Sequence, residues 1–166
     1  MNSKLKKLCI TGLLAAMVTV VTMFVMFPVG TAGAYVNAGD AIIYVAAYLV
    51  GGWWGAAAAG IGAALADILL GVAFYAPATL IIKGTMALIA SFIMTRKLKG
   101  SMFVAPVVAG LVVPVGYFLY EWAITSFEGA FAGITFNLIQ YAGCLVIGIV
   151  LLIIASRVKN SITKEK

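Results

Sequence analysis

The sequence contains no histidine, only two cysteines and only five acidic residues among 166. Without histidine it lacks the commonest metal ligand and general base, and it carries no metalloprotease motif and no P-loop motif G-x-x-x-x-G-K-[ST]. Cys9 and Cys144 lie inside apolar runs, so we interpret both as packing residues. We therefore expect no enzymatic activity, no cofactor and no metal site. Any energy for transport must come from partner subunits or from a gradient.

Charge is also scarce: charged residues make up 10% of the chain and hydrophobic residues 64%. Globular domains are roughly half apolar and a quarter charged, so a soluble domain of this length has too little interior for this much apolar surface. The alternating pattern of a barrel strand is absent. The 18 glycines suit helices that pack closely in a bilayer. We predict an all-α integral membrane protein in contact with the lipid bilayer.

Six apolar segments predict a single membrane domain of six transmembrane helices, at residues 8–27, 40–51, 53–72, 78–94, 103–124 and 134–155. Most approach the roughly 20 residues that a span requires, although the second is short. Pro28–Gly39 is rich in proline and glycine and predicts a mobile loop; Thr125–Gly133 predicts a second loop. Asp40 is expected to cap the second helix, and Pro106 and Pro114 to kink the fifth.

The net charge of +6 arises from three basic clusters, with Lys83 as the only basic residue elsewhere. The clusters contain Lys4, Lys6, Lys7, Arg96, Lys97, Lys99, Arg157, Lys159, Lys164 and Lys166. They are short and flank apolar spans, so we interpret them as topology signals and not as a nucleic-acid-binding surface. Six spans place all three on one side of the membrane, which the positive-inside rule assigns to the cytoplasm. We therefore predict a multi-pass plasma-membrane protein with both termini cytoplasmic.

Polar residues inside the apolar segments concentrate near one membrane face. Asp67 lies roughly 20 Å from the inner end of its predicted helix and Lys83 roughly 8 Å from the outer end of its own. Glu121 and the segment Asn137–Tyr141 also fall in the outer half. Charges in a bilayer are costly and are usually functional. We infer a wet pocket that opens to the outside, with Asp40 at its edge.

The residues of this predicted pocket offer amides, aromatic faces and charges. Asn137 and Gln140 suit the edge of a heterocycle or an interhelical hydrogen bond, and tyrosines suit stacking. Lys83 can meet a substrate carboxylate or phosphate, or can pair with Asp67 or Asp40 to hold the bundle; both alternatives stay open. The candidate substrate-binding residues are Tyr35, Asn37, Asp40, Asp67, Tyr75, Lys83, Tyr117, Glu121, Asn137, Gln140 and Tyr141.

Three motifs carry a family resemblance: Asn37-x-Gly39-Asp40, a Gly/Ala-rich helix that ends in Ala66-Asp67, and Ala76-Pro77-x-x-Leu80-x-x-Lys83-Gly84. Through them the chain resembles the S components of energy-coupling factor (ECF) vitamin transporters, and it looks most like the riboflavin-type subgroup. The resemblance implies a six-helix subunit that binds a vitamin from outside. It also implies a transmembrane coupling subunit and two cytosolic ATPase subunits as partners.

Small residues in the first predicted helix suit close helix contact. Gly12 and Ala16 form a small-xxx-small pair beside Ala15, which suits packing within the bundle or docking of another membrane subunit. The resemblance implies docking on the coupling subunit, and it implies that Pro28–Gly39 is a gating loop over the pocket.

The ligand is less constrained than the family. Relatives in this subgroup take riboflavin, pyridoxine or cobalamin-like compounds. The predicted pocket has more acid than base, which disfavours a strongly anionic ligand, so we favour a neutral vitamin such as riboflavin. A stand-alone channel or secondary transporter requires a polar path through both leaflets, and a structural membrane protein requires no ligand; both stay as alternatives.

Overall fold

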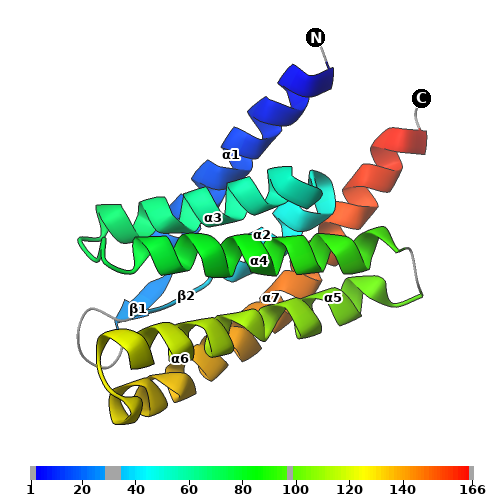
Figure 1. Ribbon diagram of the computed structural model, residues 1–166. Helices are drawn as coiled ribbons and strands as arrows, with labels where there is room; N and C mark the ends of the chain where they lie inside the picture. Colours follow the sequence, from blue (N-terminus) through cyan, green and yellow to red (C-terminus); the bar gives the residue numbers. More distant parts are fainter. Residues whose placement is uncertain (1–2, 29–34, 97–98, 165–166) are drawn as a thin grey trace.

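A computed structural model of the chain describes residues 3–28, 35–96 and 99–164. Its helices are α1 (Ser3–Phe24), α2 (Gly39–Leu49), α3 (Gly52–Leu69), α4 (Ala76–Thr95), α5 (Ser101–Gly110), α6 (Val112–Ile124) and α7 (Phe127–Lys164). Two short strands, β1 (Met26–Pro28) and β2 (Tyr35–Asn37), pair antiparallel with Met26 opposite Asn37. The bundle is helical apart from this hairpin (Figure 1), which agrees with the predicted all-α class.

Among the described residues, five helical segments are long and apolar enough to cross a membrane: Ser3–Phe24, Gly52–Leu69, Ala76–Thr95, Ser101–Ile124 and Phe127–Ser161. The predicted fifth span is therefore present as α5 followed by α6. The predicted second span, 40–51, corresponds to α2, an apolar helix of 11 residues. A helix of that length reaches only about 16 Å, and most of its side chains are buried inside the bundle.

The predicted mobile loop Pro28–Gly39 contains regular structure. Its described ends belong to the β1–β2 hairpin, while residues 29–34 lie outside the described residues. The prediction that Asp40 caps α2 was wrong, because Ala38 occupies the cap position. Instead the Asn37 side-chain oxygen accepts a hydrogen bond from the Gly39 N–H at 2.9 Å. Asp40 lies in the first turn and is 2% exposed.

The predicted loop Thr125–Gly133 was also largely wrong, because α7 begins at Phe127 and continues past the predicted end at residue 155 to Lys164. Glu128 therefore lies in the first turn of α7, where a negative charge suits the helix dipole. Pro106 and Pro114 were predicted to kink the fifth span. α5 ends at Gly110 and α6 begins at Val112, between the two prolines. Gly110 lies four residues before Pro114, where the missing N–H and the ring of a proline disrupt a helix.

Helix α3 packs against α4 on one side and α1 on the other through residues without bulky side chains. A Cβ atom on Gly60 would lie 2.7 Å from the carbonyl oxygen of Leu80 on α4. A Cβ atom on Gly62 would lie 2.5 Å from the carbonyl oxygen of Ala15 on α1. Glycine at these two positions lets the backbones meet, which is how helices associate in lipid.

The core lies where α2 and α4 meet α7. Tyr44, Met86 and Leu152 are fully buried there, and the Tyr44 hydroxyl donates to the carbonyl oxygen of Pro106 on α5 at 3.1 Å. Satisfying that hydroxyl allows a large aromatic side chain to fill the centre of the bundle without an unpaired polar group.

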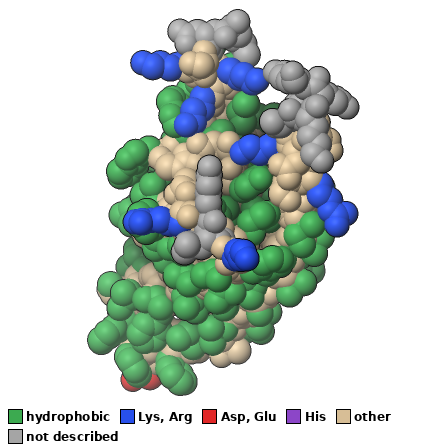
Figure 2. Space-filling view, turned by 90° about the vertical axis from the view of Figure 1, so that its right-hand side faces the viewer, with side chains coloured by type: hydrophobic (Ala, Val, Ile, Leu, Met, Phe, Trp, Pro, Cys, Tyr) green, Lys and Arg blue, Asp and Glu red, His purple; other side chains and the backbone are tan. Residues whose placement is uncertain are grey.

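Both termini lie at the same end of the bundle as the turn between α4 and α5 (Figure 1). Figure 2 faces this end, and Lys and Arg side chains gather over it. The hairpin and the turns that join α3 to α4 and α6 to α7 lie at the opposite end. The described parts of the three basic clusters thus share one end, as their spacing predicted; Lys97 and Lys166 lie outside the described residues.

Candidate functional site

Polar side chains of α4 and α6 face each other in matched rows. Tyr75, directly before α4, and Thr79 and Lys83 are spaced four residues apart and so share one helix face. On α6, Tyr117 and Glu121 are also four residues apart. The Tyr75 hydroxyl donates to Glu121 Oε1 at 3.4 Å, and the hydroxyls of Thr79 and Tyr117 are 2.9 Å apart. The Lys83 ammonium lies 5.2 Å from the centre of the Tyr117 ring.

The innermost members of this site form a buried ion pair. Lys83 Nζ lies 2.7 Å from Asp40 Oδ1, with side-chain exposures of 3% and 2%. The sequence left open whether Lys83 pairs with Asp67 or with Asp40, and in the structure its ion-pair partner is Asp40. The amide nitrogen of Gln140 on α7 donates to the other Asp40 oxygen at 2.8 Å. The Asp40 carboxylate therefore contacts both an ammonium and an amide, and it joins α2, α4 and α7. A buried charge needs such partners to offset its lost hydration.

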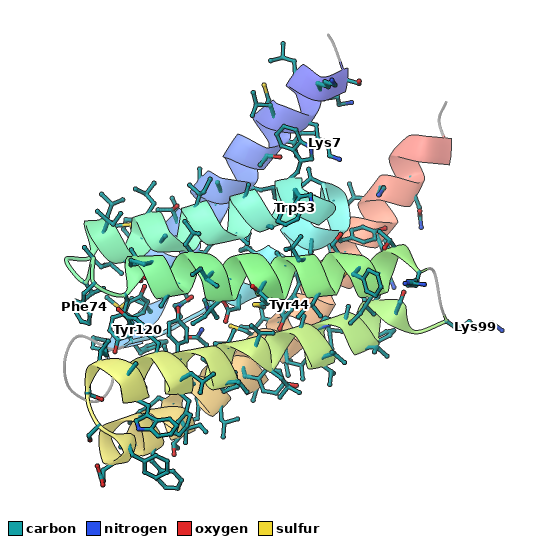
Figure 3. The ribbon with its side chains drawn as sticks, viewed as in Figure 1. Lys7, Tyr44, Trp53, Phe74, Lys99 and Tyr120 are labelled. Carbon is teal, nitrogen blue, oxygen red and sulfur yellow. The ribbon has the colours of Figure 1, made fainter. Side chains whose placement is uncertain are left out.

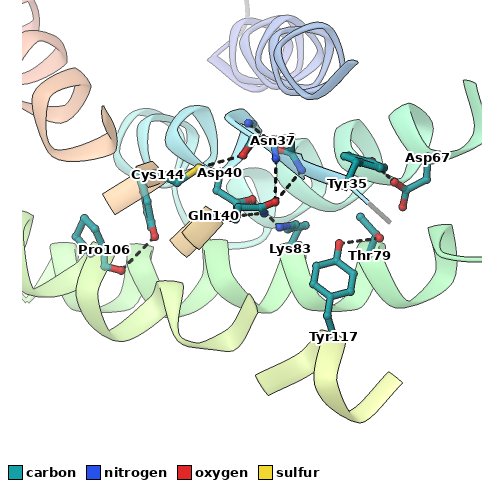
Figure 4. A network of polar contacts seen from close by, with 12 residues as sticks. Tyr35, Asn37, Asp40, Asp67, Thr79, Lys83, Pro106, Tyr117, Gln140 and Cys144 are labelled. Atoms are coloured by element: carbon teal, nitrogen blue, oxygen red, sulfur yellow. Dashed lines mark hydrogen bonds and ion pairs between the residues drawn. The ribbon is translucent and has the colours of Figure 1, made fainter. Parts of the chain in front are cut away.

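Gln140 also connects the ion pair to the hairpin (Figure 4). Its Oε1 atom accepts from the backbone N–H of Asn37 at 2.9 Å and from the Asn37 side-chain amide at 3.3 Å. The Cys144 thiol donates to the Asn37 carbonyl at 3.2 Å, so this cysteine does more than pack. Strand β2 is thereby fixed against α7 by three hydrogen bonds at one residue.

Asp67 at the end of α3 receives a hydrogen bond on Oδ1 from the Tyr35 hydroxyl. Burial and the nearby Asp67 carboxylate raise the pKa of Tyr35, so its hydroxyl stays protonated and able to donate. The second oxygen, Asp67 Oδ2, is buried and has no hydrogen-bond partner among the described residues. The same holds for Glu121 Oε2, and Glu121 is 8% exposed.

Asn137, Gln140 and Tyr141 of α7, which were predicted to belong to one pocket, take different partners. Gln140 joins the network described above. The Asn137 side-chain amide donates to the Gly133 carbonyl of its own helix at 3.3 Å. The Tyr141 hydroxyl donates to the Val107 carbonyl on α5 at 3.0 Å. In the described structure, Asn137 and Tyr141 therefore make their hydrogen bonds outside the network.

Sequence reasoning missed three members of the polar site. Thr79 lies four residues before Lys83, so helical spacing was a sufficient signal for it. Tyr120 donates to the Phe74 carbonyl and ties α6 to the turn before α4; both residues lie at the end of the bundle away from Lys99 (Figure 3). Neither Tyr120 nor Cys144 carried a sequence signal, because their partners are backbone atoms distant in the chain.

The small residues of α1 fall on two faces. Gly12 and Ala16 are exposed, and no atom lies within 4 Å of the position of a Cβ on Gly12. Ala15 is half-buried, and its backbone contacts Gly62 of α3. Packing within the bundle therefore uses Ala15, while Gly12 and Ala16 face outward.

Fold and site together define a multi-pass membrane protein with a buried polar cluster. The family of ECF-type riboflavin transporter S components matches residues 2–157, so the chain belongs to this family. S components are substrate-binding transport subunits without enzymatic activity. A protein of Pyrococcus woesei, described as an uncharacterized protein, is 33% identical over 132 residues, which is 79% of this chain and 88% of the relative.

Two solved structures share the fold. The S component for biotin of an ECF-type ABC transporter superposes with a TM-score of 0.71 at 18% identity, covering 96% of this chain and 95% of that one. The S component of a bacterial ECF transporter gives a TM-score of 0.64 at 22% identity, covering 96% and 99%. The family resemblance inferred from the sequence is therefore confirmed, and these likenesses establish the architecture.

Proposed function

We propose that this S component captures riboflavin at the polar cluster from outside the cell and delivers it with an ATP-driven energising module. The observation that carries the proposal is the buried row of side chains shared by α4 and α6, which joins hydroxyls, a carboxylate and the Lys83 ammonium. Apolar helices in lipid bury such groups at a cost. Their concentration in one place supports a ligand site.

The chemistry of the cluster supports a neutral heterocycle that bears hydroxyl groups. Tyr75 and Tyr117 offer aromatic faces with ring centres 6.2 Å apart in an edge-to-face arrangement. Beyond its ion pair, the Lys83 ammonium has no hydrogen-bond partner among the described residues, so its N–H groups are available to ring carbonyl oxygens. Asp67 and Glu121 each keep one acceptor oxygen for a donor such as a hydroxyl.

The orientation of the protein is part of the proposal. The basic clusters and both termini share one end of the bundle, which the positive-inside rule places in the cytoplasm. Tyr75 and Glu121 lie near the opposite end, since one directly precedes α4 and the other is in the last turn of α6. Capture from outside follows from this arrangement.

The partners in this proposal are a transmembrane coupling subunit and two cytosolic ATPase subunits. The outward face of α1, with Gly12 and Ala16, is the proposed contact with the coupling subunit, because small exposed residues permit close helix approach. Ala15 packs against Gly62 of α3, and this contact leaves Gly12 and Ala16 on the outward face of α1.

The test is uptake of riboflavin into proteoliposomes. We expect uptake only when the chain is reconstituted with a complete energising module and ATP is present on the ATPase side. Riboflavin flux through the chain alone would favour the alternative of a channel or secondary transporter. Mass spectrometry of small molecules extracted from purified protein identifies another vitamin, such as pyridoxine or a cobalamin-like compound, if the ligand is not riboflavin.

A further inference from the structure

A groove of about 430 Å³ lies between α3 and α4 on the outside of the bundle. The two helices lie side by side (Figure 1), and their backbones come close because a Cβ on Gly60 would lie only 2.7 Å from the Leu80 carbonyl oxygen. Gly60 and Gly84 line the groove without side chains, whereas Trp53 and Ile81 beside it are 80% and 65% exposed. The surface is therefore hollow between two rows of projecting side chains.

This α3–α4 groove is separate from the polar cluster and opens toward lipid. Lys83 is buried in the cluster, while Ile81 and Thr85, two residues away on either side, are exposed in the groove. Thr85 and Trp53 carry the only polar side-chain atoms among the described residues that line it. Since α3 and α4 are both long and apolar enough to cross a membrane, hydrocarbon and not water fills a groove of this composition.

One end of the groove combines an aromatic side chain with a cation. The Gly52 N–H donates to Ser91 Oγ at 2.7 Å, which sets the start of α3 level with the last turns of α4. Trp53 and Phe92 directly follow these two residues in the chain, and the Arg96 guanidinium lies 4.4 Å from the centre of the Phe92 ring. This is the end of the bundle over which Lys and Arg side chains gather (Figure 2). Tryptophan and arginine at such a level are typical of the boundary between lipid and water.

The distance from this boundary to the groove matches the depth of one leaflet. Ile81, Thr85, Leu88 and Phe92 are spaced i, i+4, i+7 and i+11 and share one face of α4, which leads from the groove to Arg96. Along the helix, Leu88 lies about 12 Å and Ile81 about 22 Å from Arg96. A leaflet with its headgroups is about 20 Å deep. A lipid whose phosphate lies at Arg96 therefore has its acyl chains at the depth of the groove.

We propose that the α3–α4 groove binds one acyl chain of an anionic phospholipid whose phosphate contacts Arg96. A basic side chain at the membrane surface attracts an anionic headgroup, and the groove holds the chain below it. A helix of a partner subunit is about 10–12 Å across, too wide to enter between two helices whose backbones meet at Gly60. A single hydrocarbon chain is narrower and follows the groove. The site is independent of which vitamin the polar cluster binds.

Native mass spectrometry of the full chain in detergent measures the fraction that carries one added phospholipid. Phosphatidylglycerol is the anionic probe, and phosphatidylcholine with the same acyl chains is the neutral one; we expect the unaltered chain to retain phosphatidylglycerol more strongly. Gly84→Leu is expected to abolish this retention, because a Cβ there meets nothing closer than 3.7 Å and the rest of the side chain fills the groove. Gly143→Leu is the matched control on an exposed part of α7, where nothing lies within 4 Å of a Cβ.

A second pair of variants tests the headgroup contact. Arg96→Gln is expected to lower the apparent affinity for phosphatidylglycerol about fivefold, the effect of one basic side chain near a membrane surface. It should leave the affinity for phosphatidylcholine unchanged. Lys99→Gln removes the same charge from an exposed position of the same basic cluster, outside the groove, and is expected to leave both affinities as they were.

Full retention of phosphatidylglycerol by Gly84→Leu overturns the inference, as does an equal loss in Gly143→Leu. A loss in Lys99→Gln as large as that in Arg96→Gln overturns the assignment of the headgroup. If Gly84→Leu retains the lipid but no longer copurifies with the coupling subunit, the groove is a docking site for a helix and the inference is overturned. Thr85→Phe, at another exposed position in the groove, replaces Gly84→Leu if that variant fails to fold. Riboflavin titration of the same variants reports on the proposed function separately.

Discussion

Lys83 on α4 and Asp40 on α2 form a buried ion pair with 2.7 Å between Nζ and Oδ1. The pair ties the short helix α2, which reaches only part of the way across a bilayer, to a full span. Gln140 of α7 donates to the same carboxylate, so the stability of the bundle and the position of the hairpin both depend on this contact.

The first prediction concerns this ion pair. Lys83→Met leaves Asp40 buried without its cation and is expected to destabilise the fold by about 3–5 kcal/mol. Combining it with Asp40→Asn removes both charges and is expected to recover most of that loss. Thermal unfolding in detergent measures both effects. Lys99→Met, at an exposed position beside α5, is the control and should leave the unfolding temperature unchanged. A double variant as unstable as Lys83→Met alone would contradict this account of the pair.

The second prediction concerns the bridge from Gln140 to the hairpin. Gln140→Glu keeps an acceptor oxygen for Asn37 but replaces the donor to Asp40 with a like charge. Repulsion between the two buried carboxylates should displace the side chain from the position in which it accepts from Asn37. We expect faster hydrogen exchange at the Asn37 backbone amide, measured by mass spectrometry of the peptide that contains it. Asn137→Asp provides the comparison, because among the described residues the Asn137 side chain bonds only to its own helix. Its replacement should leave the exchange rate at Asn37 unchanged. Unchanged protection in Gln140→Glu would mean that the hairpin is held by other contacts.

The third prediction concerns the contact between α1 and α3. A Cβ on Gly62 would lie 2.5 Å from the Ala15 carbonyl and 3.0 Å from Val18 Cβ. Gly62→Val should therefore force the helices apart and cost about 1–3 kcal/mol, the usual range for overpacking. Thermal unfolding checks this, with Gly12→Val as the control because nothing lies near that position. Equal unfolding temperatures for the two variants would show that the tight packing is not required.

The fourth prediction concerns docking. Gly12→Leu places a bulky side chain on the outward face of α1, where the isolated chain has room for it. We expect normal riboflavin binding but reduced copurification with the coupling subunit, because close helix approach depends on small residues. Full association of Gly12→Leu with the energising module would exclude this face as the docking surface.

The sequence was sufficient for the class, and it singled out several residues that the structure brings together in the polar cluster. Long apolar runs and three basic clusters predicted the helical membrane architecture, because bilayer thickness and charge placement act locally along the chain. The rarity of charges in lipid singled out Asp40, Asp67 and Lys83 before any contact was visible. What it left open was the pairing, since nothing in the sequence decided whether Lys83 pairs with Asp40, pairs with Asp67 or meets a ligand.

The remaining features depend on contacts between distant parts of the chain. Gln140 lies 100 residues from Asp40, and helical spacing grouped it with Asn137 and Tyr141, which bond elsewhere. The hairpin was hidden because its strands have three residues each and flank a segment rich in glycine. Such short strands are specified by their pairing and by the helix against which they pack, not by local preference.

The measurement that tests the account most directly is an equilibrium titration of the purified chain, without any partner subunit, against riboflavin. The account predicts saturable quenching of flavin fluorescence at one ligand per chain, and a marked loss of affinity in Tyr117→Ala, where the hydroxyl facing Thr79 and the ring beneath Lys83 are both removed. Saturable binding that Tyr117→Ala leaves unaltered, or no binding by the unaltered chain, would contradict it.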